Sequence, residues 1–251
     1  MIEVNQIEYT YRIIGTEGNL FVDRKAEYEN LKAVEFLNIN NETVYFDQIS
    51  GDKVAKYIEG VILSSLDYKL YLEDVSETLK KLHFSGIKPY NDYGLIQRLD
   101  LYESYTQVKS LLYQELKEQW VQIYKIDHEH MPKVLCHNDA QRSNMIVAKD
   151  HLYLLDWEYA GANEFYYDIA SFGNIRFEDA LELLDIYLDR KATRDEQNNV
   201  RFYRMYQALQ WHQVALRKEM IGLSPILNID FKSYAVKFLD LANQLYHEIK
   251  G

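Results

Sequence analysis

The first sixty residues alternate short apolar runs with polar segments, a pattern that is typical of a small mixed domain. Runs rich in Ile, Tyr, Thr and Val predict β-strands at residues 6–14, 43–46 and 53–58. Between the first two strands, apolar residues recur at helical spacing after Asp23, a side chain that can cap the start of a helix. This segment predicts a helix over residues 24–37.

After Gly60 the apolar positions follow helical spacing almost throughout. They predict helices over residues 72–84, 93–126, 177–189, 197–221 and 231–249. From this change we expect an N-terminal lobe of residues 1–59, a hinge near residues 57–60, and a mainly helical C-terminal lobe of residues 60–251. The expected fold class is therefore α+β.

One segment of the second lobe breaks the helical pattern. Residues 133–136 predict a short apolar strand, and a polar loop over residues 137–144 follows it. Two further apolar runs predict a hairpin with strands at 145–148 and 152–155 and a turn at Lys149 and Asp150. A polar loop held between buried strands is costly unless its polar groups are used, so we expect this loop to have a function.

Composition narrows the class of protein. Hydrophobic residues make up 47% of the 251 residues, which excludes a disordered chain. Ten Gly and three Pro favour long helices over a many-stranded fold. A single cysteine, Cys136, excludes a disulfide framework and a Cys-rich zinc site. The net charge of −11 argues against a nucleic-acid partner and is compatible with a cationic ligand.

The sequence contains no segment that predicts export or membrane insertion. Polar residues such as Glu3 and Glu8 interrupt the first strand region, unlike the apolar core of a signal peptide. No run approaches the roughly 20 apolar residues that span a bilayer. We therefore expect a cytoplasmic protein without a membrane partner.

Three oxygen-bearing side chains of the loop and hairpin indicate a metal site. Asp139 and Asn144 lie five residues apart in the loop, and the predicted hairpin returns Asp156 beside them. Carboxylate and amide oxygens suit Mg²⁺, which also keeps waters for a phosphate ligand. An Asp-x4-Asn loop with a later Asp is typical of phosphoryl-transfer enzymes, in which the first Asp accepts the proton of the attacking hydroxyl. The alternative is structural: Asp139 and Asn144 would cap turns, and Asp156 would cap the next helix.

Longer motifs around these residues resemble a known family. The segments CHNDAQRSN at 136–144 and LLDWEYA at 154–160 resemble the choline/ethanolamine kinases, within the wider aminoglycoside-phosphotransferase-like superfamily, and the bacterial choline kinases are the most similar. The likeness extends to shorter segments: KAEYEN at 25–30, KYIEG at 56–60, LH at 82–83 and DIA at 168–170. It implies a protein-kinase-like fold of two lobes, with ATP and Mg²⁺ as cofactors.

The resemblance implies roles for residues of the loop and hairpin. Asp139 matches the catalytic base, and Asn144 and Asp156 match the magnesium ligands. Gln141 lines the same loop on the substrate side, and Asp168 braces the loop. The histidines of these motifs are interpreted as structural.

For the nucleotide, the resemblance implies a second group of residues. Arg12 falls where such enzymes place the cation that holds the phosphates, and Glu27 falls where the partner of that cation lies. Tyr57 and Ile58 would offer backbone groups to the adenine. Other interpretations stay open, because Arg12 could extend from its strand to solvent and Glu29 is a rival to Glu27.

The sequence departs from the family at two places. The family has a glycine-containing turn that folds over the phosphates before the first predicted strand, but residues 1–5 contain no glycine. We expect a short N-terminal lobe without this loop; either the start codon is assigned too late, or the enzyme covers ATP poorly. In the ammonium-binding cage, Tyr159 and Trp211 match two aromatic positions, but Ala208 replaces a companion Trp and Ile175 replaces an expected acid. An aromatic stripe at helical spacing is also typical of a core, so Trp211 stays open between cage and core.

These interpretations predict an ATP- and magnesium-dependent phosphotransferase that acts on the hydroxyl group of a small, cationic alcohol. Choline or ethanolamine leads, and thiamine and aminoglycosides are alternatives. A nucleotide-binding pseudokinase is the rival from another class; the missing glycine turn favours it, and the intact Asp139, Asn144 and Asp156 disfavour it. A phosphatase-like metal hydrolase would need more ligands than this loop supplies. The oligomeric state stays open.

Overall fold

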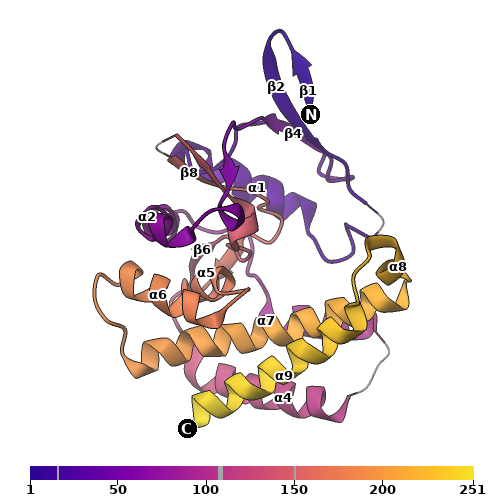
Figure 1. Cartoon of the computed structure of the whole chain (residues 1–251), viewed down its shortest axis with the longest axis vertical. Helices are drawn as coiled ribbons and strands as arrows, with labels where there is room; N and C mark the ends of the chain where they lie inside the picture. The colour runs from indigo at the N-terminus through magenta and orange to yellow at the C-terminus, as the bar shows by residue number, and fades with distance from the viewer. Residues whose placement is uncertain (16, 107–109, 150) are drawn as a thin grey trace. The chain divides into compact units, whose positions relative to one another are not determined.

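The computed structural model describes residues 1–15, 17–106, 110–149 and 151–251 (Figure 1). These residues form two compact units: Met1–Tyr93 with Lys133–Ala192, and Gly94–Pro132 with Thr193–Gly251. The predicted lobe boundary at Gly60 does not follow this division. Strand β5 (Val61–Ile62) pairs with β7 (Met145–Ala148), so the chain after Gly60 joins the predicted hairpin within the first unit. The division into lobes at residues 59 and 60 stays a prediction.

The N-terminal sheet has the strand order β1-β2-β4-β3, and each neighbouring pair is antiparallel. Its strands are β1 (Ile2–Val4), β2 (Ile7–Arg12), β3 (Thr43–Phe46) and β4 (Lys53–Lys56). The sequence did not predict β1. Its hairpin with β2 turns at Asn5 and Gln6, which have left-handed φ angles of 53° and 65°. Such turns usually place glycine at the second position, and Gln6 removes that signal.

Helix α1 (Arg24–Val34) begins where the sequence predicts. The carboxylate of Asp23 caps it by accepting hydrogen bonds from two N–H groups of the first turn. A 3-10 turn, Glu35–Leu37, continues the chain to the predicted end. The helix buries apolar side chains together with the carboxylate of Glu27, so it places a charged group inside the first unit.

The remainder of the first unit surrounds the predicted loop. Strands β7 and β8 (His151–Leu154) form the predicted hairpin, and Asp150 of the predicted turn lies outside the described residues. Strand β6 (Val134–Cys136) precedes the loop and pairs with β9 (Gly161–Asn163). The helices of this part are α2 (Leu72–His83), α5 (Tyr166–Phe172) and α6 (Phe177–Tyr187), with 3-10 turns at Leu63–Ser65, Tyr68–Tyr71 and Arg142–Asn144.

Helices make up the second unit as far as it is described. They are α3 (Leu95–Ser104), α4 (Leu111–Ile123) with a π-helical turn Tyr124–His128, α7 (Arg194–Met220), α8 (Leu223–Leu227) and α9 (Phe231–Lys250). The single helix predicted over 93–126 is two helices, because Ser110 starts α4 by accepting a hydrogen bond from the N–H of Tyr113; residues 107–109 lie outside the described residues. Figure 1 shows α7 and α9 side by side. Trp120 and Phe202 are buried in this unit, and their rings stack 4.8 Å apart.

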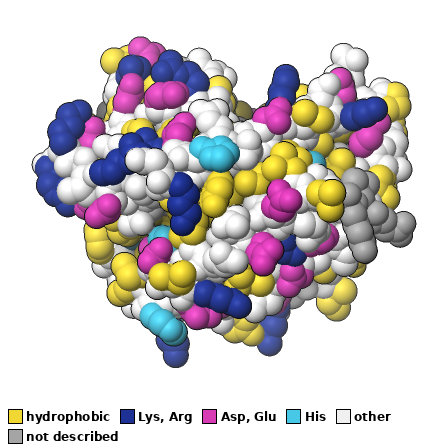
Figure 2. Space-filling model, turned by 90° about the horizontal axis from the view of Figure 1, so that it is seen from below, with side chains coloured by type: hydrophobic (Ala, Val, Ile, Leu, Met, Phe, Trp, Pro, Cys, Tyr) yellow, Lys and Arg dark blue, Asp and Glu magenta, His cyan; other side chains and the backbone are white. Residues whose placement is uncertain are grey.

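Within the described ranges, no helix is both long and apolar enough to cross a bilayer. On the face drawn in Figure 2, Lys and Arg side chains are interspersed with Asp and Glu side chains and do not gather into a basic surface. This distribution agrees with the acidic composition of the chain.

Candidate active site

The loop after β6 brings the predicted base into contact with its neighbours. The Oδ2 atom of Asp139 accepts a hydrogen bond from Nδ2 of Asn144 at 2.7 Å and another from Nε2 of Gln141 at 3.1 Å. Asn144 also donates to the backbone carbonyl of Asp139 at 3.0 Å. No described residue donates a hydrogen bond to Oδ1 of Asp139. This second oxygen can therefore accept a proton from a bound molecule.

The hairpin places Asp156 beside this loop. The N–H of Leu155 donates to the carbonyl of Asn144 at 2.8 Å and joins the end of β8 to the end of the loop. Asp156 has a φ of 64°, a left-handed conformation that is unfavourable for a side chain with a Cβ. Backbone strain of this kind is concentrated at functional sites. The side chain of Asp156 is 44% exposed, so its carboxylate is accessible to a ligand.

The surroundings of Asp139 favour its protonated form. Burial raises the pKa of this carboxyl and the negative charge of Asp156 raises it further, whereas the amide donors of Asn144 and Gln141 lower it; the resulting pKa is about 8. A base with a pKa near neutral pH is well suited to accept the proton of an alcohol.

The oxygen donors at this place fit magnesium. Asn144 turns its amide nitrogen toward Asp139, so its amide oxygen remains for a cation. Asp156 adds a carboxylate from the adjoining strand end. Mg²⁺ needs only one or two such oxygens from the protein when phosphates and waters supply its other ligands. Asn144 and Asp156 are therefore the residues that could hold the ion.

Arg12 and Glu27 form the ion pair that the resemblance implies. Nη1 of Arg12 lies 2.7 Å from Oε1 of Glu27, and Nη2 donates to Oε2 at 3.0 Å. Arg12 also donates to the carbonyl of Gly51 at 2.9 Å and to Oδ1 of Asp156 at 3.3 Å. The guanidinium therefore connects the sheet, α1 and the hairpin instead of extending to solvent, and its partner is Glu27, not Glu29.

Sequence reasoning missed three charged residues around this pair. Nη1 of Arg24, which is buried, donates to Glu27 at 2.6 Å and to Glu158 at 3.0 Å. Burial raises the pKa of Glu158. Lys53 is buried on β4, opposite Arg12 in the β2–β4 ladder. The i,i+3 spacing of Arg24 and Glu27 was a usable signal. The place of Lys53 depends on strand register, and Glu158 meets Arg24 only through tertiary folding, 134 residues apart in the sequence.

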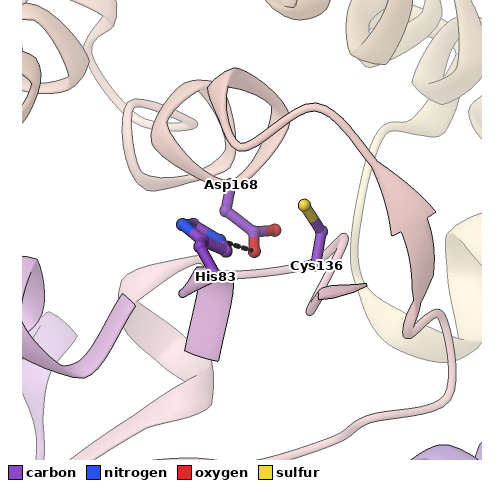
Figure 3. A group of neighbouring side chains, drawn as sticks. All are labelled: His83, Cys136 and Asp168. Atoms are coloured by element: carbon purple, nitrogen blue, oxygen red, sulfur yellow. Dashed lines mark hydrogen bonds and ion pairs between the residues drawn. The ribbon is translucent and has the colours of Figure 1, made fainter. Parts of the chain in front are cut away.

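The buried carboxylate of Asp168 braces the loop after β6 (Figure 3). Asp168 of α5 accepts hydrogen bonds from the N–H groups of Asn138 at 2.7 Å and His137 at 2.8 Å. Nε2 of His83, at the end of α2, lies 3.0 Å from Oδ2 of Asp168, and its Nδ1 lies 2.9 Å from the hydroxyl of Tyr187. Asn138 has a left-handed φ of 60°. These bonds thus stabilise an unfavourable backbone conformation immediately before the predicted base.

Figure 3 also contains Cys136, but the geometry there is that of a hydrogen-bonded brace. Ligand atoms of His83, Cys136 and Asp168 lie within 4.8 Å of one another. Both oxygens of Asp168 already accept backbone hydrogen bonds, and the thiol of Cys136 donates to the carbonyl of Asn163 at 3.5 Å. Burial raises the pKa of the Cys136 thiol well above its ordinary value, which disfavours the thiolate that binds metals.

The hinge residues differ in the backbone groups that they can offer to adenine. The N–H of Tyr57 donates to the carbonyl of Glu8 at 2.9 Å and is therefore occupied. The N–H of Ile58 forms no hydrogen bond with any described residue. Ile58 can thus provide a donor, and Tyr57 can provide only its carbonyl.

Gln141 lies within the loop after β6, and Tyr159 contacts this loop. Oε1 of Gln141 accepts a hydrogen bond from Nδ2 of Asn174 at 2.7 Å. The carbonyl of Tyr159 accepts from Nδ2 of Asn138 at 3.0 Å, which ties this tyrosine to the residue before the base. Ile175, which stands where the family has an acid, is 67% exposed. The roles of Gln141 and Tyr159 in acceptor binding stay predictions.

Trp211 belongs to the second unit. Its half-buried ring on α7 lies 6.3 Å from the ring of Phe238, and Nζ of Lys218 lies 5.9 Å above it. The ring borders an apolar cavity of about 210 Å³. Tyr203 on the same helix is fully buried, as a core residue is. A role of Trp211 in an ammonium cage stays a prediction.

Comparisons with known proteins relate this arrangement to others. The model of the phosphotransferase enzyme family matches residues 50–209. Protein LicA of Haemophilus influenzae is 27% identical over 267 residues, which cover 99% of this chain and 97% of that protein. The crystal structure of choline kinase LicA from Streptococcus pneumoniae has a TM-score of 0.81 at 22% identity and covers 98% of this chain and 88% of that one. A structure of LicA in complex with AMP has the same TM-score at 21% identity, with 98% and 86% covered. These likenesses confirm the predicted α+β, protein-kinase-like fold class.

Proposed function

The chain belongs to the phosphotransferase enzyme family, and from this premise we propose that it transfers the terminal phosphate of ATP to the hydroxyl group of choline. The observation behind the proposal is the carboxylate of Asp139, which Asn144 and Gln141 hold by two hydrogen bonds next to Asp156. A protein of the same fold from Streptococcus pneumoniae is a choline kinase, which supports the choice of acceptor.

The proposed reaction uses Asp139 as general base. Its Oδ1 accepts the proton of the acceptor hydroxyl while the oxygen attacks the terminal phosphorus of ATP, and the bond from that phosphorus to the bridging oxygen of ADP breaks. Asn144 and Gln141 orient the carboxylate through its other oxygen. Because phosphoryl transfer needs little covalent chemistry from the protein, correct placement of this base supplies much of the catalysis.

The nucleotide would lie along the cluster of charged side chains around Arg12 in the first unit. Arg12, between Glu27 and Asp156, can hold its phosphates, and the N–H of Ile58 can donate to the adenine. Asn144 and Asp156 would hold magnesium, which would neutralise the charge of the phosphates. The structure of LicA in complex with AMP, a protein of the same fold, supports nucleotide binding by this chain.

The acceptor is proposed to be a quaternary ammonium alcohol. Tyr159 follows Asp156 by three residues and offers an aromatic face, which attracts a methylated ammonium group. Ile175 stands where an acid would accept hydrogen bonds from a primary amine, so we expect choline to be preferred over ethanolamine. Thiamine and aminoglycosides are alternative acceptors for the same chemistry. We also propose a cytoplasmic location, because ATP is available there.

The test is a panel of acceptors assayed for ADP release with ATP and magnesium. Choline, ethanolamine, thiamine and an aminoglycoside should be compared, and choline should give the highest kcat/KM. Turnover with the aminoglycoside alone would refute choline as the acceptor but leave the phosphotransferase activity supported. ATP binding without turnover of any acceptor would favour a pseudokinase.

A further inference from the structure

Lys53 of β4 is a buried lysine without a hydrogen-bond or ion-pair partner among the described residues. The residue is 8% exposed, and its ammonium group forms no hydrogen bond or ion pair with any described residue. Lys56, on the same strand, has such a partner: its side chain is 43% exposed, and its ammonium group pairs with Glu42 at 2.5 Å. An ammonium group on so little exposed a residue has less access to water than one at the surface, and without an acceptor among the described residues its placement is unfavourable unless a ligand supplies one.

Lys53 faces the groups that surround Arg12. The two residues are opposite each other in the ladder between β2 and β4, so their side chains lie on the same face of the sheet. Burial lowers the pKa of Lys53 and the charge of Arg12 lowers it further, while Glu27, Asp156 and Glu158 raise it. The ammonium group therefore lies in the charged cluster that includes a candidate magnesium ligand.

We propose that Lys53 is a second phosphate-binding cation, which contacts phosphate oxygens of ATP alongside Arg12. This inference rests on the proposed function. Arg12 already donates to Glu27, to the carbonyl of Gly51 and to Asp156. The three N–H donors of Lys53 have no acceptor among the described residues, and a phosphate group would supply both the acceptors and the negative charge.

A different role for Lys53 would be to balance the negative charges of Asp156 and Glu158. Charge balance alone would act through the metal affinity or the stability of the protein, so any loss of ATP or ADP binding that it causes would require magnesium. Contact with phosphate predicts a loss for each ligand that carries phosphates, and none for a nucleoside, whether or not magnesium is present. A series of ligands therefore separates the two roles.

The experiment is a calorimetric titration of the intact chain with ATP, ADP and adenosine, each with magnesium and again in EDTA. We expect Lys53→Met to weaken ATP and ADP binding roughly tenfold or more, and to change adenosine binding by less than about twofold. Lys53→Arg should retain most of the affinity, because it keeps the charge. Lys56→Met is the matched control on the same strand and should bind all three ligands as the wild type does.

The outcomes distinguish this inference from the function on which it rests. Unchanged ATP affinity in Lys53→Met, an equal loss for adenosine, or a loss for ATP that appears only with magnesium would overturn the role of Lys53 and leave the proposed function intact. A wild-type protein that binds neither ATP nor ADP would refute the proposed function as well. Thermal unfolding without ligand checks the fold, and Lys53→Met should unfold at no lower temperature than the wild type because an unpartnered charge is removed. Lys53→Gln gives the same comparison if the Met variant does not fold.

Discussion

Replacing Asp139 by asparagine should lower activity and, in the magnesium-free protein, raise stability by an amount that grows as the pH rises from about 4 to 8. Asparagine has nearly the same shape, and its amide oxygen can still accept hydrogen bonds from Asn144 and Gln141. It cannot accept the proton of the acceptor hydroxyl, so turnover should fall about 100- to 10,000-fold, the usual size of a general-base effect. The same change removes a carboxyl group that is unfavourable to ionise in the folded protein.

The size of the stability effect follows from the pKa of about 8. Between about pH 4 and pH 8, the folded protein keeps a proton on Asp139 that the unfolded chain releases, so the free energy of unfolding falls as the pH rises. The limit is about 1.4 kcal/mol per pH unit, but Asp139 is partly exposed and solvent screening reduces the slope. We expect roughly 1–2 kcal/mol between pH 5 and pH 8, or about 2–8 °C in unfolding temperature.

The assay is thermal unfolding of wild type and Asp139→Asn in EDTA at pH 5, 6.5 and 8. The advantage of the variant should grow with pH, because asparagine does not titrate. Asp240→Asn, which changes an exposed carboxylate of α9, is the matched control and should show no such growth. A difference between variant and wild type that stays constant or shrinks from pH 5 to pH 8 would refute the argument from burial. Turnover within about twofold of wild type would remove Asp139 from the mechanism.

Other substitutions test the remaining parts of the site. Asp156→Ala and Asn144→Ala should raise the magnesium concentration for half-maximal activity, Asp156→Ala more strongly because it removes a charge. Wild-type magnesium dependence in Asp156→Ala would show that Asp156 does not bind the metal. Tyr159→Ala should raise the KM for choline much more than the KM for ATP, and equal rises would argue against contact with the acceptor. Trp211→Ala should raise the same KM if the ring lines the cage, and should mainly lower the unfolding temperature if it is core. His83→Leu should lower kcat several-fold to about tenfold with little change in the KM for ATP. His83→Gln can still donate to the carboxylate of Asp168 and should recover most of the lost kcat. A lower unfolding temperature with wild-type kcat would make His83 merely structural.

Local signals predicted the elements that local chemistry determines. Helix α1 begins at Asp23 because that side chain bonds to the first turn, and this interaction needs nothing from the rest of the chain. Strand β1 was missed because its turn uses Asn5 and Gln6 without a glycine. The helix predicted over 93–126 was too long, because the spacing of apolar residues continues across the break before Ser110.

The residues of the candidate site likewise divide into those that local sequence predicts and those that only the pairing of distant strands places. Asp139 and Asn144 were found because they lie in one loop, and the hairpin that returns Asp156 is short enough to predict from its turn. The position of Lys53 beside Arg12 depends on how two distant strands are aligned, and no local pattern indicates that register. The hydrogen bond that occupies the N–H of Tyr57 depends on the same sheet.

The hydrogen bonds of Arg12 link the two ligands of the proposed reaction. In the protein alone, Arg12 divides its donors between Glu27 and Asp156 and so partly neutralises a carboxylate that magnesium would use. A phosphate that draws Arg12 away makes Asp156 more available to a cation, and a cation at Asp156 makes Arg12 more available to phosphate. By thermodynamic reciprocity, each ligand must then raise the affinity of the other by the same factor. We therefore expect nucleotide and metal to bind with positive cooperativity.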